Sequence, residues 1–199
     1  MKKTFTASYI AKVGIFSALA FILYVLNFPL PLFPSFLEIH LSDFPALISG
    51  FALGPLGGAL TVLVKILIKL PFTSTMGVGE CADLINGLAF VLPASIIYKK
   101  NKSKKSAVIG ITAGAVCSVV TSIFANWLII IPFYLKVMKW DLVMIVSVCS
   151  KVIPFITEGN FYPCYLFLSV LPFNTLRCLV VSLLTVLVYK RISVLLKRF

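Results

Sequence analysis

Long, nearly uninterrupted runs of apolar residues constrain this chain more than any other feature. The first run extends from about Ser8 to Asn27, long enough for a helix to cross a hydrocarbon core of roughly 30 Å at about 1.5 Å per residue. Because 60% of the 199 residues are hydrophobic, the chain has more apolar surface than one soluble core of this size buries. The sequence therefore predicts an all-α integral membrane protein that forms a single domain over residues 1–199.

Five further segments extend this pattern to a bundle of about six transmembrane helices. Ser42 and Asp43 begin a second segment that ends near Leu53 and is too short to span alone. We expect Pro132 to stop the fifth span, and residues 133–170 to form a partly helical external loop. The later spans are predicted at about 59–70, 80–98, 107–131 and from 171 to the tail at 189–199.

Charge gives the predicted orientation of the bundle. The net charge is +12, but the basic residues lie at the ends of apolar runs and not in one patch with aromatic residues, so we expect no nucleic-acid partner. The densest positive cluster is the loop at 99–106, which the positive-inside rule places in the cytoplasm. All six acidic residues then fall on the outer side, and both termini are predicted to be cytoplasmic.

Small residues repeat along one face of the first predicted helix. Ala7, Ala11, Gly14 and Ala18 recur at i, i+4, i+7 and i+11, so a neighbouring backbone can approach this face closely. The pattern fits internal packing and a partner-binding surface about equally well.

Arg177 and Asn174 are the most informative polar residues, because we expect them at the mouth of the last span. A cation near hydrocarbon is costly unless it faces a cavity or a partner, so it marks a candidate site; the alternative is an arginine that reaches the headgroups. Other polar groups are predicted at the same end of the bundle. They are Glu38, Asp43, Glu80, Asp83 and Asn126. Lys65 and Lys69 are expected to reach the surface or to pair with Glu38 and Asp43.

Aromatic residues surround these polar groups in the sequence. The expected wall residues are Phe28, Phe33, Phe36, Trp127, Phe133, Tyr134 and Phe173. Apolar walls with a few fixed polar groups are typical of small-molecule pockets. Carboxamides offer a donor and an acceptor side by side, which complements an imide edge, so a flat, amphipathic heteroaromatic ligand suits the site.

Several kinds of chemistry find no support in the sequence. His40 is the only histidine, which disfavours a histidine-based zinc site or a catalytic triad. The chain contains no G-x-x-x-x-G-K-[ST] phosphate loop for ATP hydrolysis. Glu80 and Asp83 are the one paired-carboxylate candidate, and without a metal-ligand set we expect neither an enzyme nor a metal or cofactor.

The ordered motifs of the chain resemble the riboflavin-binding S component of energy-coupling factor (ECF) vitamin transporters. The similarity covers nearly the whole chain and is specific as a set. The motifs are 41–47 (LSDFPAL), 52–55 (ALGP), 79–80 (GE), 86–87 (NG), 90–94 (FVLPA), 126–127 (NW) with Pro132, and 172–174 (PFN). The family usually shows lysine where this chain has Arg177 and commonly asparagine where it has Asp83.

The resemblance implies a substrate-capture subunit in the cell membrane that binds riboflavin at its outer face. It also implies partners, namely a transmembrane coupling subunit and two cytoplasmic ATPases, with the small-residue face of the first helix meeting the coupling subunit. By motif, Asn126 and Asn174 would bind the isoalloxazine ring and Asp43 would lie near the ribityl chain. Two alternatives remain open, an S component for another vitamin or flavin (thiamine, pantothenate, folate or FMN) and an autonomous secondary carrier. The second is disfavoured because we find no internal repeat.

Overall fold

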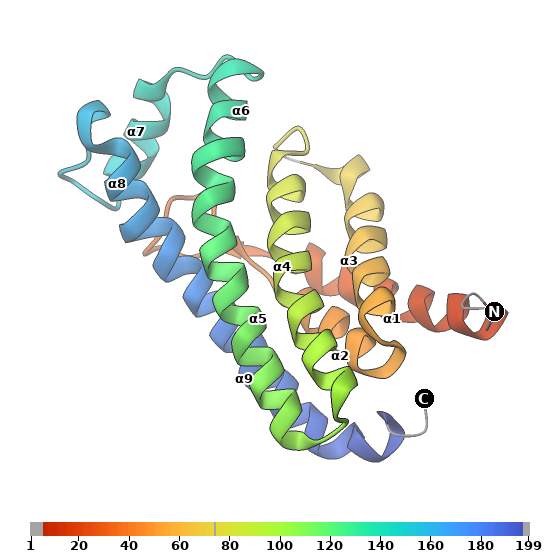
Figure 1. Cartoon of the computed structure of the whole chain (residues 1–199). Coiled ribbons are helices and arrows are strands. Elements are labelled where there is room, and N and C mark those ends of the chain that lie inside the picture. Colours follow the sequence, from red (N-terminus) through yellow and green to blue (C-terminus); the bar gives the residue numbers. More distant parts are fainter. Residues whose placement is uncertain (1–5, 74, 197–199) are drawn as a thin grey trace.

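The computed structural model describes residues 6–73 and 75–196 and is dominated by long helices (Figure 1). Five stretches within this part of the chain are long and apolar enough to cross a membrane. The prediction of an all-α membrane protein is confirmed as far as the helical class and the presence of several apolar spans are concerned. The stretches are Ala7–Val25 (α1), Pro55–Phe72 (α3 at Pro55–Lys69 with the short helix η1 at Leu70–Phe72), Val78–Lys100 (α4), Lys104–Lys136 and Glu158–Tyr189.

The predicted second segment is a short apolar helix, α2 (Asp43–Leu53), which is not long enough to span alone. Gly54 joins it directly to α3 with a positive φ of 86°, a conformation that favours glycine. Pro55 then occupies the first turn of α3, where its missing N–H leaves no bond unmade. The third span therefore begins at Pro55, four residues earlier than expected from the apolar run alone.

The prediction that Pro132 stops the fifth span is wrong. Helix α5 (Lys104–Ala125) continues through a π-helical turn, η2 (Asn126–Ile130), into α6 (Ile131–Lys136). In this turn the Ile131 N–H donates to the Asn126 carbonyl, five residues back. The wider turn accommodates the proline, whose ring would clash with the preceding turn of a regular α-helix.

The predicted external loop at 133–170 is also shorter than expected. It contains α7 (Leu142–Ser150), and the last span begins at η3 (Glu158–Asn160) and α8 (Phe161–Tyr165). A second π-helical turn, η4 (Leu166–Val170), precedes Pro172, and α9 (Leu171–Leu196) follows without a break. Arg177 consequently lies well inside a long helix and not at its mouth.

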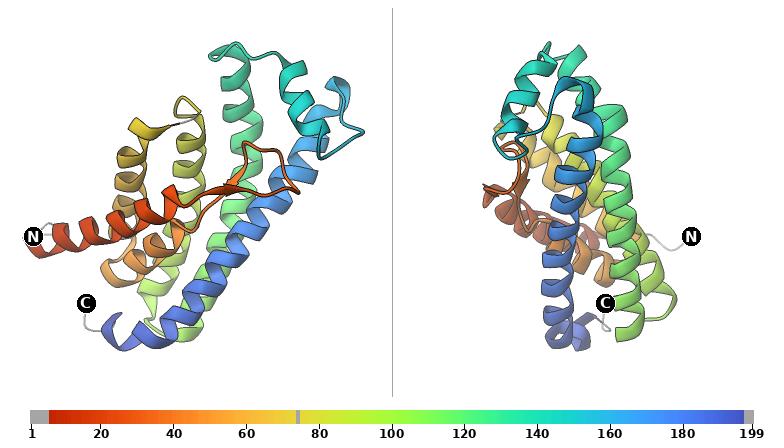
Figure 2. Two further views of the ribbon diagram at one scale, coloured as in Figure 1. Left: turned by 180° about the vertical axis from the view of Figure 1, so that it is seen from behind. Right: turned by 90° about the vertical axis from the view of Figure 1, so that its left-hand side faces the viewer.

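The long helices α4, α5 and α9 lie side by side, whereas α1 runs across the bundle beside α2 and α3 (Figures 1 and 2). The basic turn between α4 and α5 and the end of α9 lie at one end of the bundle. The turn between α3 and α4, together with α7 and α8, lies at the other end. Gly110 and Gly114 allow close packing of α5 on α4, because an added Cβ would lie 2.6 Å and 2.3 Å from carbonyl oxygens of α4.

Two apolar clusters hold the bundle together. One cluster joins α2, α4, α5 and α9 around Phe51, Phe90 and Val181. The other lies toward the opposite end, around Ile131 and Phe161, and includes α7 and η4. The five cysteines are free thiols that behave as small side chains in this structure.

Candidate functional site

A cavity of about 360 Å³ opens between the helices and the segment that connects α1 to α2. This segment is anchored by a two-residue antiparallel ladder, β1 (Phe28–Pro29) with β2 (Glu38–Ile39), and the Asn27 amide donates to the Glu38 carboxylate. The cavity volume lies in the range of small-molecule pockets. Polar and charged lining residues are Asn27, Ser35, Glu38, His40, Lys69, Thr75, Glu80, Asp83, Asn86, Asn126, Asn174 and Arg177.

Four buried charges from four helices meet at this cavity, with Asp83 and Arg177 in its lining and Asp43 and Lys65 behind them. Asp43 (α2), Lys65 (α3), Asp83 (α4) and Arg177 (α9) are each at most 6% exposed. Lys65 Nζ lies 2.8 Å from Asp43 Oδ1 and 2.9 Å from Asp83 Oδ2. Arg177 Nη2 contacts Asp43 Oδ2 and Asp83 Oδ1. We call these residues the charge quartet; each cation touches both carboxylates.

The quartet carries no net formal charge, which makes its burial tolerable. An isolated ion in an apolar bundle is expensive, and paired ions need both good geometry and further hydrogen bonds to offset desolvation. Here two carboxylates share two cations. Removing one member would therefore leave an uncompensated buried charge.

His40 and Ser42 extend the quartet into the connecting segment. Lys65 Nζ donates to Ser42 Oγ at 2.5 Å, and Ser42 Oγ lies 3.1 Å from His40 Nδ1. An ammonium group only donates, so the serine hydroxyl hydrogen is left for His40 Nδ1. The proton of a neutral ring is then on Nε2, which lies 3.3 Å from Asp83 Oδ1. Burial lowers the pKa of His40, although the Asp83 carboxylate opposes the shift.

Glu80 lies one turn before Asp83 on α4 and faces the same cavity. Its Oε2 accepts hydrogen bonds from Thr73 Oγ1 at 2.8 Å and Thr75 Oγ1 at 3.2 Å. Thr73 Oγ1 also accepts from the Gly77 N–H, so the turn before α4 is tied to this carboxylate. The arrangement holds one acidic acceptor at a fixed place in the cavity wall.

Two carboxamides reach the cavity from the helices that contain π-helical turns. Asn126 Nδ2 donates to the Ser122 carbonyl at 2.9 Å, and Asn126 Oδ1 accepts from the Tyr165 hydroxyl at 3.0 Å. Asn174 Nδ2 donates to the Val170 carbonyl at 2.9 Å. These bonds fix both amides while each retains hydrogen-bonding capacity toward the cavity.

Most of the sequence-predicted site residues converge on one cavity. Glu80, Asp83, Asn126, Asn174 and Arg177 line it, and Asp43 lies directly behind Asp83 and Arg177. Trp127 does not line it; this side chain is 49% exposed on the outside of η2. The predicted aromatic wall is correct for Phe36, Tyr134 and Phe173, whereas Phe28, Phe33 and Phe133 do not line the cavity.

The expectation for Lys65 is confirmed in one part only, because Lys65 pairs with Asp43 as predicted. It is fully buried, does not reach the surface, and has Asp83 and not Glu38 as its second partner. Tyr24, Trp140 and Tyr165 are further lining residues that the sequence did not single out. Trp140 stacks on Tyr134 with ring centroids 4.9 Å apart. Trp140 comes just after α6, and this helix was not predicted because the span was expected to end at Pro132.

The small-residue face of α1 is exposed. Ala7, Ala11, Gly14 and Ala18 are all solvent-accessible in the isolated chain, and an added Cβ at Gly14 would meet nothing within 4 Å. The residues that α1 buries are Val13, Ser17, Ala20 and Tyr24, on a different face. Within this structure the small-residue face is therefore not used for internal packing.

These features define a multi-pass membrane protein that encloses a small-molecule cavity with fixed polar groups and aromatic walls. Residues 8–189 match the protein family described as "ECF transporter, substrate-specific component", and the chain belongs to that family. The family is a class of transporter components.

Named relatives agree with this assignment. The chain is 28% identical over 186 residues to the riboflavin transporter RibU of Staphylococcus aureus (strain TCH60), covering 94% of this chain and 90% of the relative. It is 28% identical over 184 residues to the riboflavin transporter FmnP of Bacillus subtilis (strain 168), covering 91% and 90%. A solved structure of the S component of a bacterial ECF transporter superposes with a TM-score of 0.73 at 26% identity, covering 96% of this chain and 98% of that one.

Proposed function

We propose that this chain is the substrate-binding subunit that captures riboflavin at the external face of the cell membrane for ATP-driven uptake with an ECF module. It acts as one domain over residues 1–199, is not an enzyme, and takes riboflavin as its transported ligand with no cofactor. A transmembrane coupling subunit and two ATPases supply the energy, because the sequence contains no phosphate loop of its own.

The observation that carries this proposal is the pairing of two fixed carboxamides with aromatic walls in one cavity. Asn126 and Asn174 come from different helices and line the same space as Phe173 and Tyr134. Carboxamides complement the imide edge of an isoalloxazine ring, and aromatic side chains pack on its faces. Glu80 and Asp83 offer acceptors for ribityl hydroxyl groups. Curated relatives named riboflavin transporters support the same ligand.

Orientation and partner docking complete the proposal. The basic turn between α4 and α5 faces the cytoplasm, both termini lie on that side, and α2 completes a six-helix arrangement. The cavity then opens toward the outside. Ala7, Ala11, Gly14 and Ala18 form the surface that meets the coupling subunit, since their exposed face allows close backbone approach.

Ligand titration of the purified protein tests the proposal. The protein in detergent is titrated with riboflavin, and binding is followed by quenching of flavin fluorescence. Asn174→Leu should weaken binding about tenfold or more, because ring acceptors or donors would then meet an apolar wall. Asn101→Leu is the matched control, since Asn101 is exposed in the turn between α4 and α5.

Arg177 provides a second variant at the same site. Arg177→Lys keeps the charge and should lose much less affinity than Arg177→Ala, for which we expect a loss on the order of tenfold to a hundredfold. Thiamine, pantothenate, folate and FMN are titrated in parallel. Tighter binding of one of the non-flavin vitamins than of riboflavin would replace the proposed substrate.

A further inference from the structure

A second cavity, of about 430 Å³, lies at the end of the bundle opposite the ligand cavity. It is formed by the end of α2, the Gly54 turn, the start of α3, the end of α4 and Tyr9 of α1. A neighbouring depression of about 410 Å³ shares Pro55 and Lys99 with it and adds Lys100 and Ile96. The two adjoin at Pro55 and Lys99, and we call them together the basal hollow.

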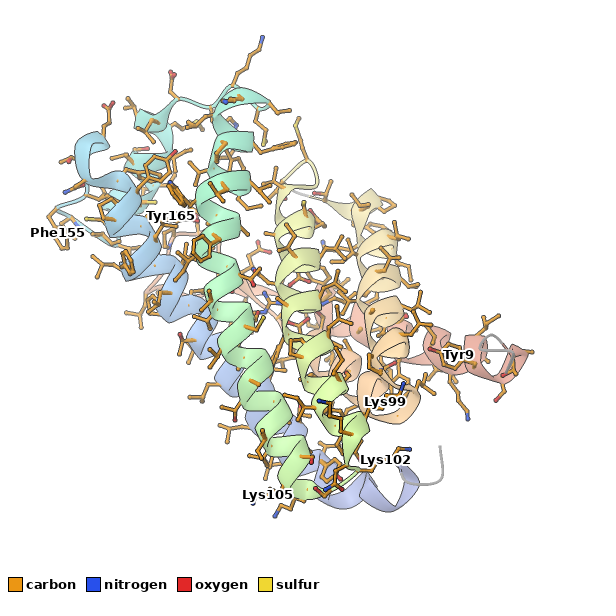
Figure 3. The ribbon with its side chains drawn as sticks, in the orientation of Figure 1. Tyr9, Lys99, Lys102, Lys105, Phe155 and Tyr165 are labelled. Carbon is orange, nitrogen blue, oxygen red and sulfur yellow. The ribbon has the colours of Figure 1, made fainter. Side chains whose placement is uncertain are left out.

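The basal hollow combines apolar walls with a cationic mouth. Its walls include Phe51, Leu53 and Leu56, and the Lys99, Lys100 and Lys102 side chains are exposed around it. Among the described residues that line it, none is Asp or Glu. Figure 3 shows Lys99 and Lys102 on the side of the bundle nearer Tyr9, whereas Lys105 lies further away at the start of α5. The hollow thus suits an anion that carries apolar chains.

The depth of the basal hollow matches that of phospholipid headgroups. The α3 span begins at Pro55 and the α4 span ends at Lys100, so both walls of the hollow lie where membrane helices end. Tyr9 and Tyr98 are among its lining residues, and amphipathic tyrosine rings are common near membrane headgroups. Leu56 and Ile96 are 45% and 48% exposed at its edge. An acyl chain has an apolar path from the lysines along this flank.

We propose that the basal hollow binds the headgroup of an anionic phospholipid, with its phosphate between Lys99 and Lys102 and its acyl chains along Leu56 and Ile96. Basic pockets between membrane helices at the cytoplasmic side are suited to such headgroups. The site is separate from the ligand cavity and shares no lining residue with it.

The test compares two double variants that remove equal charge from one loop. Lys99→Gln/Lys102→Gln alters the hollow, whereas Lys104→Gln/Lys105→Gln alters exposed lysines that do not line it. Each protein in a neutral detergent is titrated with short-chain phosphatidylglycerol, and lipid adducts are counted by native mass spectrometry. Phosphatidylcholine and glycerol phosphate are titrated alongside. Riboflavin binding, measured on every variant, checks that the fold is intact.

We expect Lys99→Gln/Lys102→Gln to weaken phosphatidylglycerol binding on the order of tenfold to thirtyfold, and the control pair to change it less than about twofold. Phosphatidylcholine should bind weakly to every protein. Equal losses in the two double variants would show a diffuse effect of loop charge and would overturn the site. Glycerol phosphate binding as tightly as the lipid would overturn the lipid assignment, because the apolar walls would then contribute nothing. An unchanged affinity in both variants would also overturn the site, because the bound lipid would then not depend on Lys99 and Lys102.

Discussion

Replacing Lys65 by methionine tests whether the charge quartet stabilises the fold as one neutral unit. Methionine keeps much of the length of the side chain and removes its charge. Lys65 is fully buried, so solvent cannot compensate for the change. The two carboxylates, Asp43 and Asp83, would then share Arg177 alone, leaving one net negative charge in the bundle interior.

The expected loss of stability in Lys65→Met follows from the two short contacts of Lys65. At 2.8 Å and 2.9 Å, each ion pair is worth about 6 kcal/mol with an effective dielectric constant of about 20. Desolvation of the ammonium group offsets several kcal/mol of this sum. The net cost of breaking a buried pair is about 3–5 kcal/mol. At about 2–4 °C per kcal/mol, we expect the apparent melting temperature to fall by about 6–20 °C.

Buried thiols provide the assay. Cys149 and Cys178 are 0% and 4% exposed, so a thiol-reactive fluorophore reports unfolding in detergent when the exposed Cys81 and Cys117 and the half-buried Cys164 are replaced by serine. Lys69→Met is the matched control. Lys69 is one turn further along α3 and lies near the same Tyr24 ring, but its recorded hydrogen bond is to the Phe72 carbonyl and not to a carboxylate.

A charge-balanced double variant separates charge from packing. Lys65→Met/Asp43→Asn restores neutrality and should recover most of the lost melting temperature. If Lys65→Met melts within about 2 °C of Lys69→Met, the quartet contributes little and the reasoning fails. If the double variant is no more stable than Lys65→Met, the loss of stability comes from altered packing and not from the unbalanced charge.

Three further predictions concern topology, coupling and the position of Asn126. In a background without native cysteines, a cysteine at Asn160 should react with a membrane-impermeant thiol reagent in intact cells and one at Asn101 should not. Asn160 directly precedes α8 and Asn101 directly follows α4, and the start of α8 and the end of α4 lie at opposite ends of the bundle (Figure 1). The reverse labelling would invert the topology. Gly14→Trp should lower uptake with riboflavin affinity unchanged, since it obstructs an exposed face; a parallel loss of affinity would argue against that surface. Tyr165→Phe removes the hydrogen bond to Asn126 and should weaken riboflavin binding several-fold, whereas Trp127→Phe should not; equal titrations for the two variants would contradict the observed placement.

The fold was largely predictable because apolar length and charge segregation are local properties of the sequence. The first helix, the short α2 and the α4 span all appear close to their predicted positions. Asp43, Asp83 and Arg177 were also identifiable, since charged groups rarely occur in apolar runs without a partner. What each of them contacts depends on how four helices pack, and no single segment carries that information.

Lys65 shows this limit clearly. Lys65 and Lys69 are the same residue type, four positions apart on one helix. The pattern alone therefore predicts the same exposure and the same kind of partner for both. In the structure one is fully buried between two carboxylates and the other is partly exposed. The difference arises because α2 and α4 deliver Asp43 and Asp83 at the level of Lys65, one turn below Lys69. A lysine in the middle of an apolar run, and not at its end, was the available signal.

The π-helical turns explain the errors that came from ending a helix at Pro132, but not the misplaced Phe28 and Phe33, which lie in the segment before α2. A wide turn inserts one extra residue and shifts the phase of every later side chain by about 100° relative to a regular α-helix. Within the described residues both such turns end two residues before a proline, at Ile130 before Pro132 and at Val170 before Pro172. If a regular α-helix is assumed through either proline, the residues after it are therefore predicted on the wrong face. If the helix is assumed to end at the proline, those residues are not predicted to be helical at all. Trp140 enters the cavity wall because the helix continues, while the neighbours Asn126 and Trp127 diverge at the turn, one inward and one outward. The prolines that looked like boundaries of the spans instead mark the places where two helices change phase to form the site.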